Sequence, residues 1–161
     1  MRQTYWILLG SLAACGPQGN PTAERAADRA ELLRLHELQR TAHLEERADL
    51  LVAPMADTVV NVGRGVVAVE SRGASQRQFQ AYFDQVTFQE WSDVAPPVIR
   101  ISAGGTMAYV IVQKRVRLTA PDSAGTPRAE HTLFAWLEIY EKQRGRWTMT
   151  TIASTDQPGP A

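Results

Sequence analysis

Acid–base chemistry in this chain would depend on one histidine and two aspartates that fall on different predicted elements. His131 interrupts an apolar alternation, so it could act as a pocket acid or hydrogen-bond donor, or it could be a partly exposed histidine at the loop end of a strand. Asp49 and Asp57 flank a short predicted helix, and either could supply a carboxylate to the mouth of a cavity. A hydratase, isomerase or cyclase would need His131 and one of these carboxylates within about one water molecule of each other.

The other reactive side chains favour neither a metal nor a cofactor. His36 and His43 are seven residues apart, roughly 10.5 Å along a helix, whereas histidines that share a metal on a helix are spaced by three or four. We therefore expect them to pack along a polar helix edge. The chain has a single cysteine, which excludes an internal disulfide and a multi-thiolate metal site. The glycines at Gly63, Gly65 and Gly104-Gly105 lack the context of a phosphate-binding loop.

The elements that must position these residues follow from the spacing of apolar side chains. Helical spacing runs from about Pro21 to Glu46 and puts Leu32, Leu35, Leu38 and Ala42 on one stripe, with His36 and His43 along its edge. Two shorter helices are predicted at 47–52 and 74–84. Strands are predicted at 58–62, 65–69, 86–94, 98–102, 106–118, 130–142 and 146–155, with a long polar loop at 119–129. This order predicts an α+β fold, a cone-shaped curved antiparallel sheet of about six strands covered by one long helix and two shorter ones.

Alternation sorts the two longest predicted strands into faces. Tyr109 and Ile111 share one face of the strand at 106–118, whereas Val110 and Val112 share the other. Both faces are largely apolar, although an antiparallel sheet usually leaves one face to solvent. We expect one face to line the cone and the other to meet a second copy in a homodimer. The run Lys114-Arg115-Val116-Arg117 is expected to be a solvated strand end, too short for a polyanion patch.

Composition limits the class of protein. A length of 161 residues leaves room for one domain, and 44% hydrophobic with 21% charged residues is ordinary for a globular chain. Lys+Arg and Asp+Glu both total 17, so the formal net charge is zero. Without a basic excess, nucleic acid is not an expected partner.

The first fifteen residues predict the cellular location of the protein. A positive start with Arg2 precedes the apolar run Trp6–Ala14, which is too short to span a membrane and has the length of a signal-peptide core. The run ends in Leu12-Ala13-Ala14-Cys15, which resembles the lipobox of bacterial lipoproteins. The resemblance implies cleavage before Cys15 and acylation there, and with Gly16 next it favours the outer over the inner membrane. We divide the chain into a signal peptide at 1–14, an acylated cysteine and tether at 15–21, a domain at 22–156 and a flexible tail at 157–161.

Three stretches carry a second resemblance: HLEERADLLVAPMADTVVNV, the pair Arg72-Gly73, and FAWLEIYEKQRGRWTMTTIAST. In these the chain is similar to the nuclear-transport-factor-2-like superfamily and its SnoaL-like group. The resemblance implies steroid isomerases, dehydratases, cyclases and epoxide hydrolases among its relatives, together with non-catalytic binding domains. The position where isomerase-type members carry their general base is occupied by Asn61, and an amide cannot accept and return a proton near neutral pH. The position of the second family acid falls near His131 or Leu133.

We therefore expect a non-catalytic, lipid-anchored envelope protein that binds a small apolar ligand in the cone or serves as a dimeric interaction module. The expected lining residues are Asn61, Trp91, Tyr109 and His131, with Trp91 alternatively a core residue. The alternative is a SnoaL-like enzyme that acts on a small hydrophobic substrate through His131 with Asp49 or Asp57.

Overall fold

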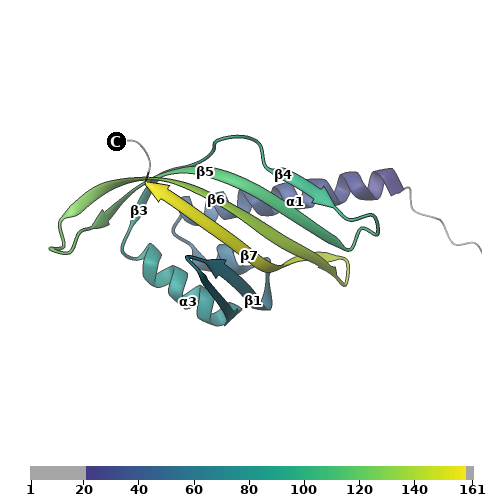
Figure 1. Ribbon diagram of the computed structural model, residues 1–161, viewed down its shortest axis with the longest axis horizontal. Helices are drawn as coiled ribbons and strands as arrows, with labels where there is room; N and C mark the ends of the chain where they lie inside the picture. Colours follow the sequence, from purple (N-terminus) through teal and green to yellow (C-terminus); the bar gives the residue numbers. More distant parts are fainter. Residues whose placement is uncertain (1–20, 159–161) are drawn as a thin grey trace, which may run out of the picture.

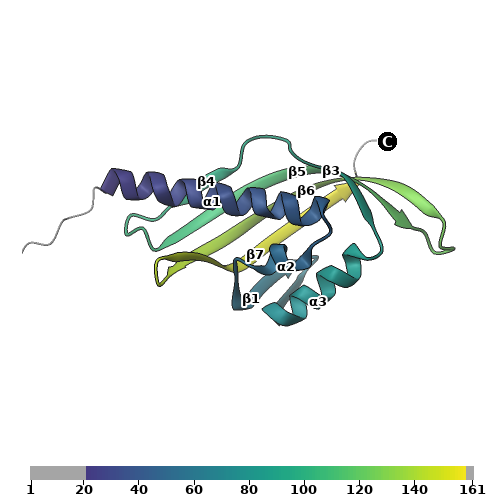
Figure 2. The same cartoon turned by 180° about the vertical axis from the view of Figure 1, so that it is seen from behind.

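The long N-terminal helix α1 (Pro21–Leu44) lies across one face of a curved sheet (Figures 1 and 2). This computed structural model describes residues 21–158. The helices α2 (Ala48–Val52) and α3 (Arg72–Phe83) follow α1 on the same side of the sheet. Ser71 caps α3, because its side chain accepts a hydrogen bond from the backbone N–H of Ala74 at 3.2 Å. None of the described helices is long and apolar enough to cross a membrane.

Within the described residues, seven strands form the sheet. They are β1 (Met55–Gly63), β2 (Val66–Ser71), β3 (Thr87–Asp93), β4 (Val98–Ile101), β5 (Met107–Pro121), β6 (Pro127–Gln143) and β7 (Arg146–Pro158). The order is β2-β1-β7-β6-β5-β3, and β4 pairs with β5 beside β3. The pair β1–β7 is parallel and the other pairs are antiparallel, so the sheet is mixed, whereas the sequence pattern predicts a wholly antiparallel one.

The sheet curves around the helices because its strands are long and interrupted by bulges. Register shifts lie between Phe88 and Glu90 in β3, between Ile139 and Tyr140 in β6, and between Met55 and Val60 in β1. The predicted α+β architecture, a curved sheet covered by one long and two short helices, is confirmed.

The hairpin between β5 and β6 differs from its prediction. The two strands stay paired as far as Pro121 and Pro127, so the expected loop at 119–129 is an extension of the sheet with a short turn at its tip. In Figure 1 this extension projects beyond the sheet as an arm. Similarly, β7 runs to Pro158, past the predicted strand end at Thr155.

The buried face of α1 is rotated from the predicted stripe. Leu32, Leu35 and Ala42 are buried as expected, but Leu38 is only half-buried. Polar side chains complete the buried face instead, namely Asp28, His36, Gln39 and His43. The reason is that the strands facing α1 offer polar partners, so the histidines at the predicted edge lie at the centre of the contact.

Candidate functional site

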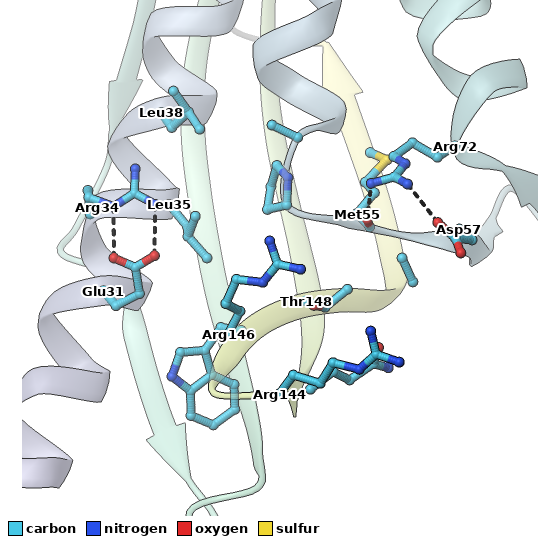
Figure 3. A pocket seen from close by; sticks show the side chains of 15 residues that line it. Glu31, Arg34, Leu35, Leu38, Met55, Asp57, Arg72, Arg144, Arg146 and Thr148 are labelled. Carbon is cyan, nitrogen blue, oxygen red and sulfur yellow. Dashed lines mark hydrogen bonds and ion pairs between the residues drawn. The ribbon is translucent and has the colours of Figure 1, made fainter.

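A pocket of about 530 Å³ opens where α1, the start of β1 and the hairpin between β6 and β7 meet (Figure 3). Ligand sites commonly have volumes of roughly 300–1,000 Å³. Its floor is apolar, with Leu35 and Leu38 from α1, Met55 from β1 and Trp147 from β7. Leu35, Met55 and Trp147 belong to the buried core, so this floor is held in place by the packing behind it. We refer to this site as the arginine pocket, because Arg34, Arg72, Arg144 and Arg146 lie around the floor.

Two of these arginines are neutralised within the pocket. Arg34 forms a two-pronged contact with Glu31, at 2.7 Å on each side, and these hydrogen bonds hold the pKa of Glu31 below its usual range. Arg72 donates to Asp57 at 2.6 Å and to the Met55 carbonyl at 3.4 Å. Figure 3 shows both pairs at the rim of the pocket.

The other two arginines come from the tight turn between β6 and β7. Neither Arg144 nor Arg146 makes an ion pair or side-chain hydrogen bond with any residue in the 21–158 range. Figure 3 shows Arg146 reaching from the hairpin into the space between α1 and the chain at Met55. The pocket therefore carries more positive than negative charge.

The interior of the cone, in contrast, is filled by side chains. The rings of His43 and Trp91 stack with centroids 3.5 Å apart, and Phe83 and Phe88 meet His43 edge-on at 5.4 Å. Burial lowers the pKa of His43 to about 4, so the imidazole is neutral near pH 7, and its Nδ1 donates to the Gln39 carbonyl at 2.7 Å. Trp91, an expected lining residue, thus lies in the core, which is the alternative that the sequence left open.

A cluster of charged groups lies deeper under α1. Lys114 is fully buried, and its Nζ lies 2.7 Å from the Asp93 carboxylate, while Nε2 of His36 lies 2.9 Å from it. Burial opposes ionisation of Asp93, but the hydrogen bonds from Lys114 and His36 outweigh it and lower its pKa. The expectation that Lys114 lies in a solvated strand end is wrong. It points to the helix-covered face, whereas Arg115 and Arg117 point away from it.

Glu138 forms a second buried polar cluster. Gln39 and Trp136 donate to its Oε1 at 2.6 and 3.0 Å, and the Tyr140 hydroxyl donates to its Oε2 at 3.0 Å. Burial raises the pKa of this carboxyl, against the effect of these donors. The hydrogen bonds tie α1 to β6, so the cluster fixes the helix on the sheet.

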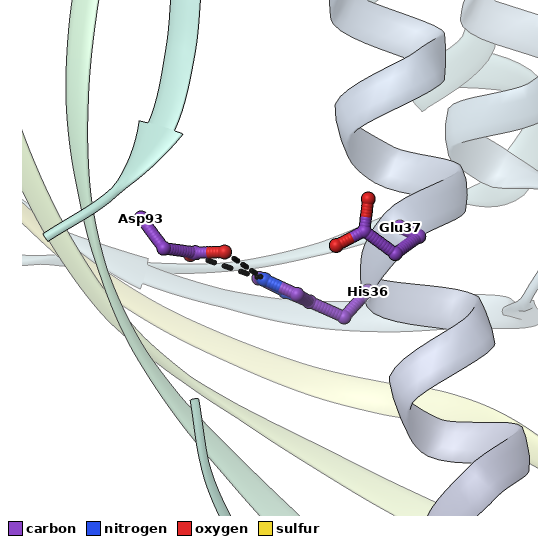
Figure 4. Close-up of side chains that lie close together, drawn as sticks. All are labelled: His36, Glu37 and Asp93. Atoms are coloured by element: carbon purple, nitrogen blue, oxygen red, sulfur yellow. Dashed lines mark hydrogen bonds and ion pairs between the residues drawn. The ribbon is translucent and has the colours of Figure 1, made fainter. Parts of the chain in front are cut away.

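One group of described residues has the spacing of a metal site. Ligand atoms of His36, Glu37 and Asp93 lie within 4.8 Å of one another (Figure 4). The ammonium of Lys114 already lies against both His36 and Asp93, at 3.2 and 2.7 Å. A divalent cation would have to share the Asp93 carboxylate with this buried positive charge, so the cluster does not suit one.

The structure does not bring the predicted catalytic residues together. His131 and Tyr109 are exposed on the outer face of the sheet, and His131 lies opposite Arg117 in the strand register. Asp49 pairs with Arg47 at 2.7 Å, and Asp57 with Arg72. No contact joins His131 to Asp49 or Asp57 among the hydrogen bonds and ion pairs of the described chain.

Two predicted site residues remain, Asn61 and Cys15, and the structure describes only Asn61. Asn61 lies on β1, and its side chain donates to Glu70 at 3.2 Å, a carboxylate that Ser75 also contacts. Asn61 is therefore engaged in holding β1, β2 and α3 together. Cys15, the expected lipidation site, lies outside the described residues.

Sequence reasoning missed the arginine pocket. The turn Gln143-Arg144-Gly145 was recognisable as tight, but nothing in a turn tells which element faces it. The available signal was that Arg144 and Arg146 both flank Gly145 and precede a tryptophan, which places two cations beside a large apolar side chain.

Solved structures share this fold. A ketosteroid isomerase-like protein from Erwinia carotovora atroseptica is similar with a TM-score of 0.62 at 16% identity, over 81% of this chain and 96% of that one. An NTF2-like protein with a cystatin-like fold from Novosphingobium aromaticivorans has a TM-score of 0.62 at 16% identity, over 87% of this chain and 88% of that one. A conserved protein from Planctomyces limnophilus has a TM-score of 0.64 at 16% identity, over 84% of this chain and 100% of that one.

At the level of sequence no family model matches the chain, and no curated protein matches it. The identities of the solved structures are low enough that they establish the fold alone. The fold is that of the NTF2-like proteins, as the sequence resemblance implies. Because this fold hosts many unrelated activities, the function has to be argued from the site.

Proposed function

We propose that this chain is a lipid-anchored envelope protein whose NTF2-like domain binds a small molecule in the arginine pocket without catalysing a reaction on it. The observation that carries the binding function is the pocket itself, which joins a fixed apolar floor to a polar rim. This proposal moves the expected ligand from the interior of the cone to its side, because His43 and Trp91 occupy the interior.

The alternative, a SnoaL-like enzyme, has less support. An acid–base reaction needs a proton-transfer group beside a space for the substrate. The pair formed by the buried His36 and the partly exposed Asp93 is the arrangement that favours it, but neither residue lines the arginine pocket. Asn61 also stands where isomerase-type relatives are expected to carry a base.

A substitution that fills the pocket tests the binding function. Leu38 is half-buried on the floor, so Leu38→Trp should occupy the space and abolish binding while the core behind stays packed. The matched control is Leu33→Trp, on the exposed side of the same helix. Binding of 4-fluorobenzoate and of neutral 4-fluorobenzamide to the full chain is measured by fluorine NMR relaxation. The proposal holds if Leu38→Trp alone loses binding, and it fails if neither compound binds or if both variants behave like the wild type.

The proposal of a lipid anchor is based on the apolar run that ends at Cys15. Two or three acyl chains at this cysteine would hold the protein stably on a membrane, where one chain gives marginal binding. Metabolic palmitate labelling should mark the wild type and not Cys15→Ser, and globomycin should block processing. Lipid on the Cys15→Ser variant would contradict the anchor.

A further inference from the structure

The arginine pocket has a charge pattern that selects among ligands. Of its four arginines, Arg34 and Arg72 are paired with Glu31 and Asp57. Arg144 and Arg146 are not paired within residues 21–158, so the pocket holds two guanidinium groups in excess. A guanidinium presents several N–H donors in a plane, which suits the two oxygens of a carboxylate or phosphate group.

The pocket that these cations line also has an apolar part. Trp147 follows Arg146 in the chain, and its indole is fixed by a hydrogen bond of 3.0 Å to Asp28. Leu35 and Leu38 from α1 line the same pocket. A ligand that fits both parts needs an anionic group at one end and an apolar body of modest size at the other.

From this arrangement we propose that the arginine pocket binds a small amphipathic anion, with its carboxylate or phosphate on Arg146, the charge of Arg144 adding to the attraction, and its apolar body on Leu35, Leu38 and Trp147. This inference rests on the proposed function and names its ligand class. Glu31 and Asp57 at the rim limit the excess positive charge, so the pocket favours one anionic group over a polyanion.

The inference is tested by removing the two unpaired charges. The variant Arg144→Gln/Arg146→Gln keeps side chains of similar polarity and leaves Arg34 and Arg72 in their pairs. Its matched control is Arg40→Gln/Arg77→Gln, which makes the same change in net charge at two exposed positions outside the pocket. Binding of 4-fluorobenzoate, phenyl phosphate and neutral 4-fluorobenzamide to the full chain is followed by NMR, and thermal unfolding verifies that each variant folds.

We expect the two anions to bind wild type and control at least about tenfold more tightly than the pocket variant, because the lost contacts are charge-assisted hydrogen bonds. The amide should bind all three proteins equally weakly. Tighter binding of benzoate assigns a carboxylate ligand, and tighter binding of phenyl phosphate assigns a phosphate ester.

The inference is overturned if the amide binds the wild type as tightly as benzoate, or if control and pocket variant lose affinity equally. In either case a loss of binding in Leu38→Trp would still support the proposed function. If inorganic phosphate competes as well as phenyl phosphate, the apolar part of the inference is wrong.

Discussion

At the scale of single residues, the buried His43 makes stability depend on pH. Its pKa is 6.5 in the unfolded chain and about 4 in the fold, because burial penalises the charged ring. As the pH falls below about 6.5, the His43 imidazole binds a proton in the unfolded state but not in the folded state. The free energy of unfolding therefore decreases towards pH 4. Between pH 7 and pH 5 this loss amounts to about 2 kcal/mol for such a shift.

The variant His43→Phe removes this titration and keeps an aromatic ring against Trp91. From pH 7 to pH 5 its free energy of unfolding, measured in urea, should fall about 2 kcal/mol less than that of the wild type. Glu138, whose pKa is raised by burial, contributes in the opposite direction in both proteins and so cancels in the difference. His131→Gln, which removes an exposed histidine, should behave like the wild type. Equal losses in wild type and His43→Phe would show that the fold does not lower the pKa of His43.

The contrast between Lys114 and Arg115 shows where residue-level prediction fails. The alternation of β5 placed them correctly on opposite faces, and the valines beside Lys114 share its buried face. A lysine on such a face is rarely buried unless it is paired. Its partners Asp93 and His36 lie 21 and 78 residues away in the chain, and a single sequence gives no sign of such long-range pairs.

At the scale of elements, the tip of the β5–β6 arm depends on one carboxylate. Asp122 accepts hydrogen bonds from the backbone N–H groups of Ala124 and Thr126, both at 2.9 Å, and from Arg128 at 3.1 Å. These bonds lower the pKa of Asp122, so it is ionised at neutral pH. The turn is exposed, and two backbone hydrogen bonds also close it, from the N–H of Asp122 to the Thr126 carbonyl at 2.9 Å and from the N–H of Gly125 to the Asp122 carbonyl at 2.8 Å.

Asp122→Ala should therefore loosen the tip and leave the sheet intact. Amide hydrogen exchange of the non-proline residues at 120–129 should become about fivefold faster, the effect of roughly 1 kcal/mol lost locally. Amides at 110–116 should keep their protection, since they belong to the core of the sheet. Ser123→Ala, in the same turn, serves as the control and should change neither region. Faster exchange throughout β5 would mean that the arm contributes to global stability.

The elements were predictable because apolar spacing is local, and their arrangement was predictable only in part. The period of 3.6 located α1 and α3, and the period of two located the strands within a few residues. The parallel pairing of β1 with β7 joins the first strand in the chain to the last, and no local pattern encodes it. The same holds for the arginine pocket, which forms only where the β6–β7 hairpin reaches α1 and β1.

At the scale of the whole molecule, the outer face of the sheet carries apolar side chains that none of the helices within residues 21–158 covers. Met107, Tyr109 and Ile111 on β5 are 51%, 41% and 42% exposed, and Val98 on the neighbouring β4 is 45% exposed. Ile111 borders a shallow groove with Leu137 and Ala153 from the next two strands. Contiguous apolar surface of this kind is typical of a protein interface. We propose that a second copy covers it, since a twofold axis places the same patch on both subunits.

A charge at the centre of this face should separate the two copies. Ile111→Asp would place a desolvated carboxylate in the interface, so native mass spectrometry of the full chain released from detergent should change from dimer to monomer. The side chain is partly exposed in the single chain, which should therefore fold with little loss of stability. Leu33→Asp introduces the same charge on the exposed side of α1, at 37% exposure, and should remain dimeric. A monomeric wild type, or a dimer that survives Ile111→Asp, would show that this face serves another purpose, because an interface built on these side chains cannot tolerate a buried, unpaired charge.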